Sequence, residues 1–84
     1  MPTLWLVDRE FDSKGLVRLT YATTDGDRTY TKELAEQRLY ASGGVTAATE
    51  VEADALEAAD PADEDRFAAE ARRMAADHDP DETI

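Results

Sequence analysis

The strongest constraint on the fold is the dipeptide Asp25-Gly26, which lies between two stretches of alternating apolar and polar residues. Such a dipeptide favours a two-residue type I′ turn between antiparallel strands. The turn would join a strand over about residues 16–24 to a strand over about residues 27–32. In this register Tyr21 lies directly opposite Tyr30. The sequence therefore predicts a β-hairpin in the first half of the chain.

A third strand is predicted over residues 3–11, ahead of the loop Ser13-Lys14-Gly15. The glycine would supply the left-handed conformation that a three-residue hairpin loop with a bulge requires. This loop pairs Phe11 with Val17, whereas a loop longer by one residue would turn the apolar side chains of the two strands to opposite faces. The three strands together form an antiparallel meander.

The two faces of this meander differ in polarity. In a continuous register Val7 lies opposite Tyr21. One face is then rich in large apolar side chains, and we expect helices to cover it: Trp5, Val7, Phe11, Val17, Leu19, Tyr21 and Tyr30. The opposite face carries smaller or more polar side chains, with two leucines: Leu4, Leu6, Thr20, Ala22, Thr29 and Thr31.

The residues after the meander predict helices. A helix over about 32–42 would end at Gly43, although a continuation of the third strand is the alternative. A second helix over about 49–59 would begin at the capping box Thr49-x-x-Glu52. Alternation of small apolar residues between 45 and 55 leaves a strand open there.

The last predicted helix has the clearest boundaries. Asp60-Pro61 provides an N-cap and a proline at the first helical position, and acidic residues follow in the first turn. Phe67, Met74 and His78 then recur at helical spacing on one face. Asp79-Pro80 would end the helix, and we expect residues 80–84 to be a frayed acidic tail.

These elements predict one α+β domain over residues 1–79. Its sheet would occupy residues 1–32, and residues 33–79 would be mainly helical. The expected architecture is a three-stranded antiparallel β-meander followed by two or three α-helices packed on one face. A chain of 84 residues leaves no room for a second core.

The charge of the chain is strongly negative and uneven. Twenty acidic residues face nine basic ones, which gives a net charge of −11, and most of the excess lies after Gly44. Lysine is scarce, and alanine, aspartate and glutamate are abundant. This composition resembles that of small haloarchaeal proteins, whose acidic surfaces suit molar intracellular salt because salt of that strength screens their self-repulsion. The resemblance implies adaptation to high salt and names no functional family.

The same composition bounds where the protein works. The chain has no cysteine, which excludes disulfides and thiol nucleophiles. Its first ten residues lack the basic and apolar regions of a signal peptide, and no apolar run is long enough to span a bilayer. We therefore expect a cytoplasmic protein that does not bind a membrane.

Candidate catalytic groups have simpler structural interpretations. Ser42-Gly43-Gly44 fits a helix end better than an anion-binding loop, because the lysine of a phosphate-binding loop is absent. His78 lies among acidic residues near the end of the last helix, where the helix dipole favours it. The carboxylates are explained by helix capping and by solvation. We therefore predict no catalytic residue, no cofactor and no metal site, and a protein that is not an enzyme.

Two functions remain, and each has its own surface. The first is a non-enzymatic protein-interaction module that self-associates, because large apolar residues are few for a monomer core; its candidate surface is Leu4, Leu6, Ala22, Phe67, Met74 and His78. The alternative is a small nucleic-acid-binding or regulatory protein that uses aromatic and basic side chains of the sheet. Its candidate face is Trp5, Arg9, Arg18, Arg28 and Lys32.

Overall fold

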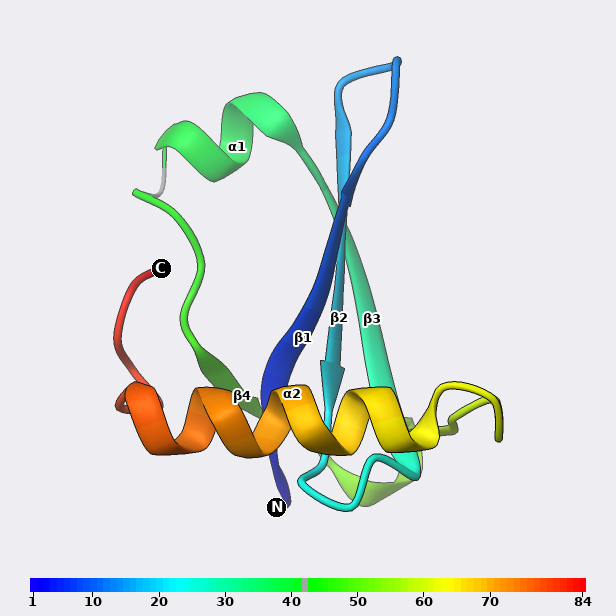
Figure 1. The fold of residues 1–84 in the computed structure, drawn as a ribbon. Helices are drawn as coiled ribbons and strands as arrows, with labels where there is room; N and C mark the ends of the chain where they lie inside the picture. The colour runs from blue at the N-terminus through cyan, green and yellow to red at the C-terminus, as the bar shows by residue number, and fades with distance from the viewer. Residues whose placement is uncertain (42) are drawn as a thin grey trace.

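The computed structural model describes residues 1–41 and 43–84. These residues form a five-stranded antiparallel sheet with strand order β4-β1-β2-β3-β5 (Figure 1). Two helices and one 3-10 turn complete the fold. The strands are β1 (Thr3–Phe11), β2 (Leu16–Ala22), β3 (Arg28–Ala35), β4 (Ala48–Glu50) and β5 (Glu57–Ala58). The helices are α1 (Glu36–Ala41) and α2 (Glu64–Asp77), and the 3-10 turn η1 is Ala53–Ala55.

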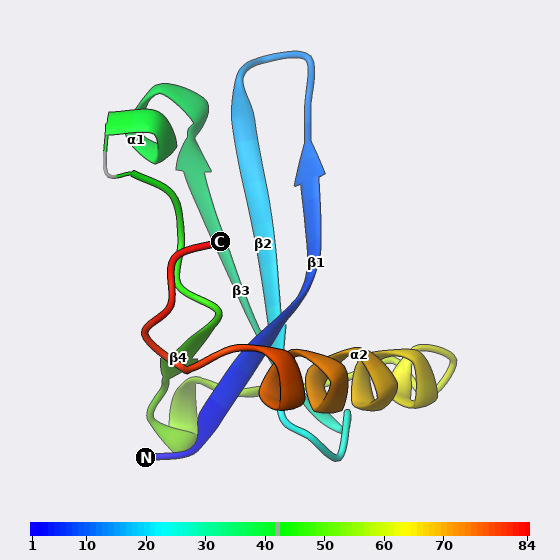
Figure 2. The same ribbon diagram turned by 60° about the vertical axis from the view of Figure 1, so that its left-hand side comes forward.

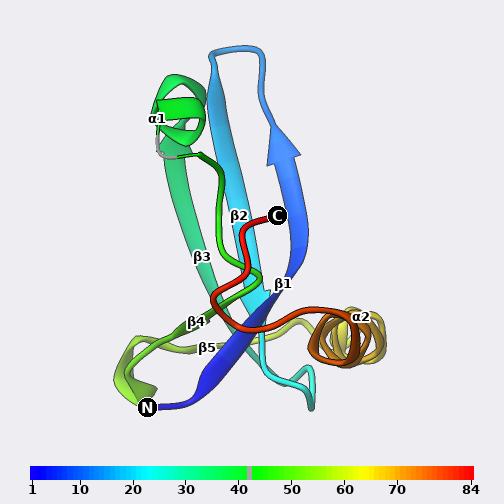
Figure 3. The ribbon, with the colours of Figure 1, turned by 90° about the vertical axis from the view of Figure 1, so that its left-hand side faces the viewer.

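The predicted three-stranded meander with helices on one face is wrong. Residues 49–59 do not form a helix, because they contribute to strand β4, the turn η1 and strand β5. Strands β4 and β5 lie at opposite edges of the sheet. The two outer strands of the meander offer unpaired backbone groups, and pairing with these outweighs the low strand propensity of alanine and glutamate. The helices also lie on different sides of the long strands (Figure 3).

The helix predicted over 32–42 is shorter than expected. Strand β3 continues through Ala35, as the alternative allowed, and α1 then covers only Glu36–Ala41. Ser42, where this helix was expected to end, lies outside the described residues. The last helix, α2, ends at Asp77. It begins only at Glu64, because a turn occupies residues 61–63.

The second hairpin has the predicted register with a different turn. Tyr21 lies opposite Tyr30, as expected. The N–H of Thr23 donates to the carbonyl of Arg28 at 3.1 Å, and Gly26 alone in this turn has a positive φ, +76°. A type I′ turn needs positive φ at both central residues, so the loop is of another type. A Cβ at Gly26 would lie 2.1 Å from a backbone oxygen of α2, so this position also needs glycine for packing.

The first hairpin follows the predicted register only in part. Phe11 lies opposite Val17 as expected, but the register shifts between Leu6 and Asp8. Val7 is the extra residue of this bulge, and Leu6 takes the place opposite Tyr21 that was predicted for Val7. A bulge of one residue moves every side chain before it to the other face.

The bulge rearranges the core. Leu4 and Leu6 join the face that holds Val17 and Leu19, while Trp5 moves to the face of its partner Ala22. Both faces of the lower sheet are consequently buried: α2 covers β1 and β2 on one side, and the segment after α1 covers the other (Figures 1 and 3). Leu4, Val17 and Leu19 are fully buried.

The C-terminal residues, expected to be frayed, are paired. The N–H of Ala47 donates to the carbonyl of Glu82 at 2.8 Å, and the N–H of Ile84 donates to the carbonyl of Val45 at 2.9 Å. Thr46 and Thr83 form a bridge between the two segments. This pairing holds the C-terminal segment over the side of the sheet opposite α2 (Figure 2).

Candidate interaction surface

The residues predicted to form an interaction surface lie mostly in the interior. Five of the six are at most 7% exposed, and His78 is half-buried. The bulge at Val7 and the packing of α2 against β1 explain this burial. The folded chain therefore does not present these residues together: Leu4, Leu6, Ala22, Phe67, Met74 and His78.

The predicted nucleic-acid face is divided between the two sides of the sheet. The cross-strand partners put Arg9 and Lys32 in one row with Leu19, and alternation puts Arg28 on the same side. Arg18 points to the other side. Trp5 is 8% exposed, so its ring is not free to stack on a base.

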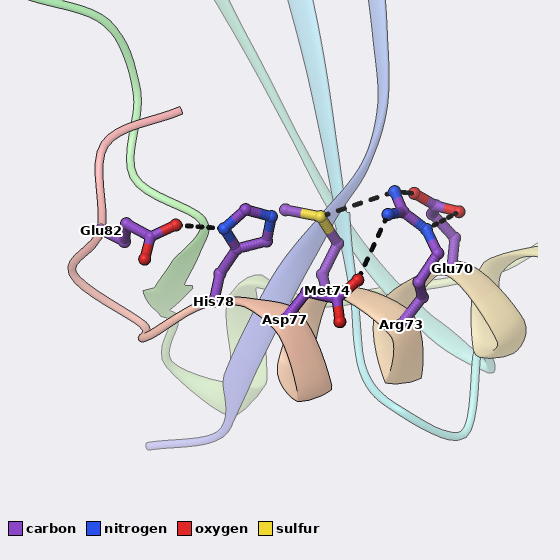
Figure 4. A network of polar contacts seen from close by, with 6 residues as sticks. All are labelled: Glu70, Arg73, Met74, Asp77, His78 and Glu82. Atoms are coloured by element: carbon purple, nitrogen blue, oxygen red, sulfur yellow. Dashed lines mark hydrogen bonds and ion pairs between the residues drawn. The ribbon is translucent and has the colours of Figure 1, made fainter.

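The polar groups of α2 form a network along its exposed side (Figure 4). Arg73 lies between Glu70 and Asp77 and pairs with both, at 3.7 Å for the Asp77 carboxylate. The hydrogen bond from Arg73 lowers the pKa of Glu70, and the same bond raises the pKa of Arg73. His78 contacts Glu82, which joins the end of α2 to the C-terminal segment. These exposed pairs are structural contacts of small energy.

Strand β3 presents an open backbone edge. The N–H of Thr23 donates to the carbonyl of Arg28, so the backbone groups of Arg28 face β2. Successive residues of an antiparallel strand direct these groups to opposite sides, so the odd-numbered residues of β3 face away from β2. Beyond the residues that pair with β5, these are Thr31, Glu33 and Ala35. We call them the β3 edge.

Strand β5 covers only the first two residues of β3 on this side. It pairs only with Arg28 and Thr29, and the N–H of Ala59 donates to the carbonyl of Asp27 at 3.0 Å. The turn η1 lies just before β5 in the chain and does not pair with β3, so no strand lies along residues 31–35 among the described residues (Figure 2).

The polar groups of the β3 edge are therefore available. Within residues 1–41 and 43–84, no partner bonds to the N–H or the carbonyl of Thr31 and Glu33, or to the N–H of Ala35. The carbonyl of Ala35 precedes α1, where it can accept the first bond of the helix. Unpaired groups of this kind are a template for a further strand.

A groove lies beside the β3 edge, on the side of the sheet opposite α2. Its volume is about 600 Å³. One wall is formed by side chains of β2 and β3, namely Tyr21, Tyr30, Lys32 and Leu34, and the other by the segment from Gly44 to Ala55. Glu50, Glu52 and Lys32 line it, together with Met1. Burial raises the pKa of Tyr21 at the base of this wall.

The upper half of β1 also has a free edge, and it is protected. The N–H of Asp12 donates to the carbonyl of Leu16, so Arg9 and Phe11 direct their backbone groups away from β2. The Asp8 carboxylate accepts a hydrogen bond from the N–H of Arg9 at 2.9 Å. The bulge at Val7 also increases the local twist. We call Arg9 and Phe11 the β1 edge.

The described residues hold no group of three or more histidine, cysteine, aspartate or glutamate side chains placed to bind a metal ion. None of their helices has the length and apolar character needed to cross a membrane.

The described residues thus define a small domain built on a twisted antiparallel sheet in which the β3 edge is unpaired. The chain belongs to DUF7967, a family of unknown function, whose model matches residues 2–84. Comparison with curated proteins gave no match, and comparison with solved structures gave none.

Sequence reasoning missed the β3 edge because it assigned the following residues to helices. Two alternatives that the sequence left open point to it. One is a longer third strand, and the other is a strand near residue 50. Together they imply a long β3 that a short outer strand covers only in part.

Proposed function

We propose that the protein is a non-enzymatic interaction module that self-associates through the β3 edge and is adapted to high salt. The observation that supports this proposal is the unpaired backbone of Thr31 and Glu33 beside a groove with apolar and aromatic walls. Addition of a strand to such an edge gives affinity through main-chain hydrogen bonds, and the groove gives specificity through side chains.

The negative charge of the protein indicates that self-association needs high salt. Two copies that each carry a net charge of −11 repel one another in dilute buffer. At about 1 M salt the screening length falls to about 3 Å, which removes most of this repulsion. Self-association is therefore strongest in molar potassium chloride.

Sedimentation velocity in molar potassium chloride tests the proposal. We expect the sedimentation coefficient to rise with protein concentration, and Glu33→Pro to remove this rise, since proline lacks the N–H and blocks the edge. Arg9→Pro, at the β1 edge, is the matched control and should associate like the unmodified protein. A chain that stays monomeric at millimolar concentration in molar salt contradicts self-association.

A further inference from the structure

We infer that two copies pair through β3 in one register, with Glu33 of each copy opposite Glu33 of the other. This inference rests on the proposed function and specifies its partner and geometry. The argument begins with symmetry, because a two-fold axis makes residue i face residue j and residue j face residue i.

The free residues select the register. Outward-facing residues must meet outward-facing residues, and Thr31, Glu33 and Ala35 are the ones available. Only a register centred on Glu33 uses all of them, because it places Thr31 opposite Ala35 of the second copy. It forms about four interstrand hydrogen bonds when the Ala35 carbonyls remain in α1.

Steric constraints give the same result. A register centred on Lys32 would bring Ala35 of the second copy to Thr29, and this place is already taken by Glu57 of β5. The register centred on Glu33 moves the second copy two residues away from β5. Its helix α1 then begins beside Tyr30.

The groove supplies an apolar contact for the second copy. In this register Leu34 and Lys32 of the second copy lie opposite Lys32 and Leu34, on the side of the sheet where the groove opens. The leucine covers apolar surface beside Tyr30.

The opposed Glu33 carboxylates make the contact sensitive to salt. They lie on the other side of the sheet, where Arg18 is the cross-strand partner of Glu33. Glu10 and Asp12 line the same shallow pocket, so the arginine does not neutralise the site. Screening by salt or removal of the Glu33 charge therefore strengthens association.

Single-cysteine cross-linking tests the register, since the natural chain has no cysteine. Residues opposite each other in a hydrogen-bonded pair have Cα atoms about 5.5 Å apart, within the range of a disulfide. Glu33→Cys should therefore form a covalent dimer in molar potassium chloride with mild oxidant. Thr31→Cys is the matched control, because its two copies would be about 14 Å apart.

We expect roughly tenfold more covalent dimer from Glu33→Cys than from Thr31→Cys. Preferential cross-linking of Lys32→Cys or Thr31→Cys would overturn the register while leaving self-association intact. Absence of dimer in sedimentation would instead overturn the proposed function. Circular dichroism of each variant checks that the fold is retained.

Discussion

The β1 edge and the β3 edge differ in how they are protected. The β1 edge follows a bulge, and the Asp8 carboxylate occupies the N–H of Arg9 at 2.9 Å. The β3 edge has neither device, and it borders the groove. Proteins protect exposed edges because unpaired strands invite association. An edge left open beside a shaped cavity is therefore a candidate contact, whereas the protected edge is not.

The first prediction separates the two sides of β3 and has the largest effect on stability. Lys32 directs its N–H to β2, so Lys32→Pro removes a ladder hydrogen bond and leaves its partner unsatisfied, at a cost of about 1–3 kcal/mol. Glu33→Pro removes only an N–H that faces away from β2 and should cost much less. Urea unfolding of the monomer at low salt measures both. Equal losses of stability would show that the assignment of open backbone groups is wrong.

The second prediction concerns the charge on the β3 edge. Two carboxylates about 5–6 Å apart repel by about 0.7–0.8 kcal/mol in a water-like dielectric, which corresponds to about a three- to fourfold weaker association. Glu33→Gln should therefore dimerise about three- to fourfold more tightly in dilute buffer and equally in molar salt. Sedimentation equilibrium at both salt concentrations gives the two constants.

The control for this charge effect is Asp25→Asn, which removes one exposed carboxylate from the turn between β2 and β3, away from the paired residues. It lowers the net charge by the same amount, so it separates a local effect from a general one. Equal strengthening by both variants would contradict a contact at Glu33.

The sequence predicted the hairpins better than it predicted the bulge in β1. Within the hairpins, turn residues and period-2 alternation correctly predicted two cross-strand pairs, Phe11 opposite Val17 and Tyr21 opposite Tyr30. These contacts are local, and the residues that specify them are close in sequence. The bulge at Val7 was not predictable, because alternation continues through it and only packing against α2 distinguishes the two faces.

The outer strands were missed for a different reason. The residues of β4 and β5 have composition that favours helix, and their strand conformation depends on partners more than twenty residues away in β1 and β3. The β3 edge depends on these distant contacts too. Lys32 could be placed on a strand from sequence, and Glu33 only through the alternative of a longer third strand. An open edge is defined by where β5 stops.

The third prediction converts the protected edge into an open one. Asp8→Ala removes the acceptor of the Arg9 N–H, so hydrogen exchange of that amide should become several-fold faster. The exchange of Thr31, which lacks such an acceptor, should not change. Nuclear magnetic resonance at low salt measures both amides in the monomer. Unchanged exchange at Arg9 would mean that Asp8 does not protect the β1 edge.

The smallest expected effect is that of nucleic acid on the fluorescence of Trp5. Its side chain lies between the sheet and α2 and is 8% exposed, so a bound base cannot stack on it without local unfolding. Titration with single-stranded oligonucleotide should leave the emission unchanged in dilute buffer and in molar salt. Quenching that Arg9→Ala and Lys32→Ala both weaken would instead favour the alternative function. It would also show that the cations on one side of the sheet, rather than the open backbone of β3, select the partner.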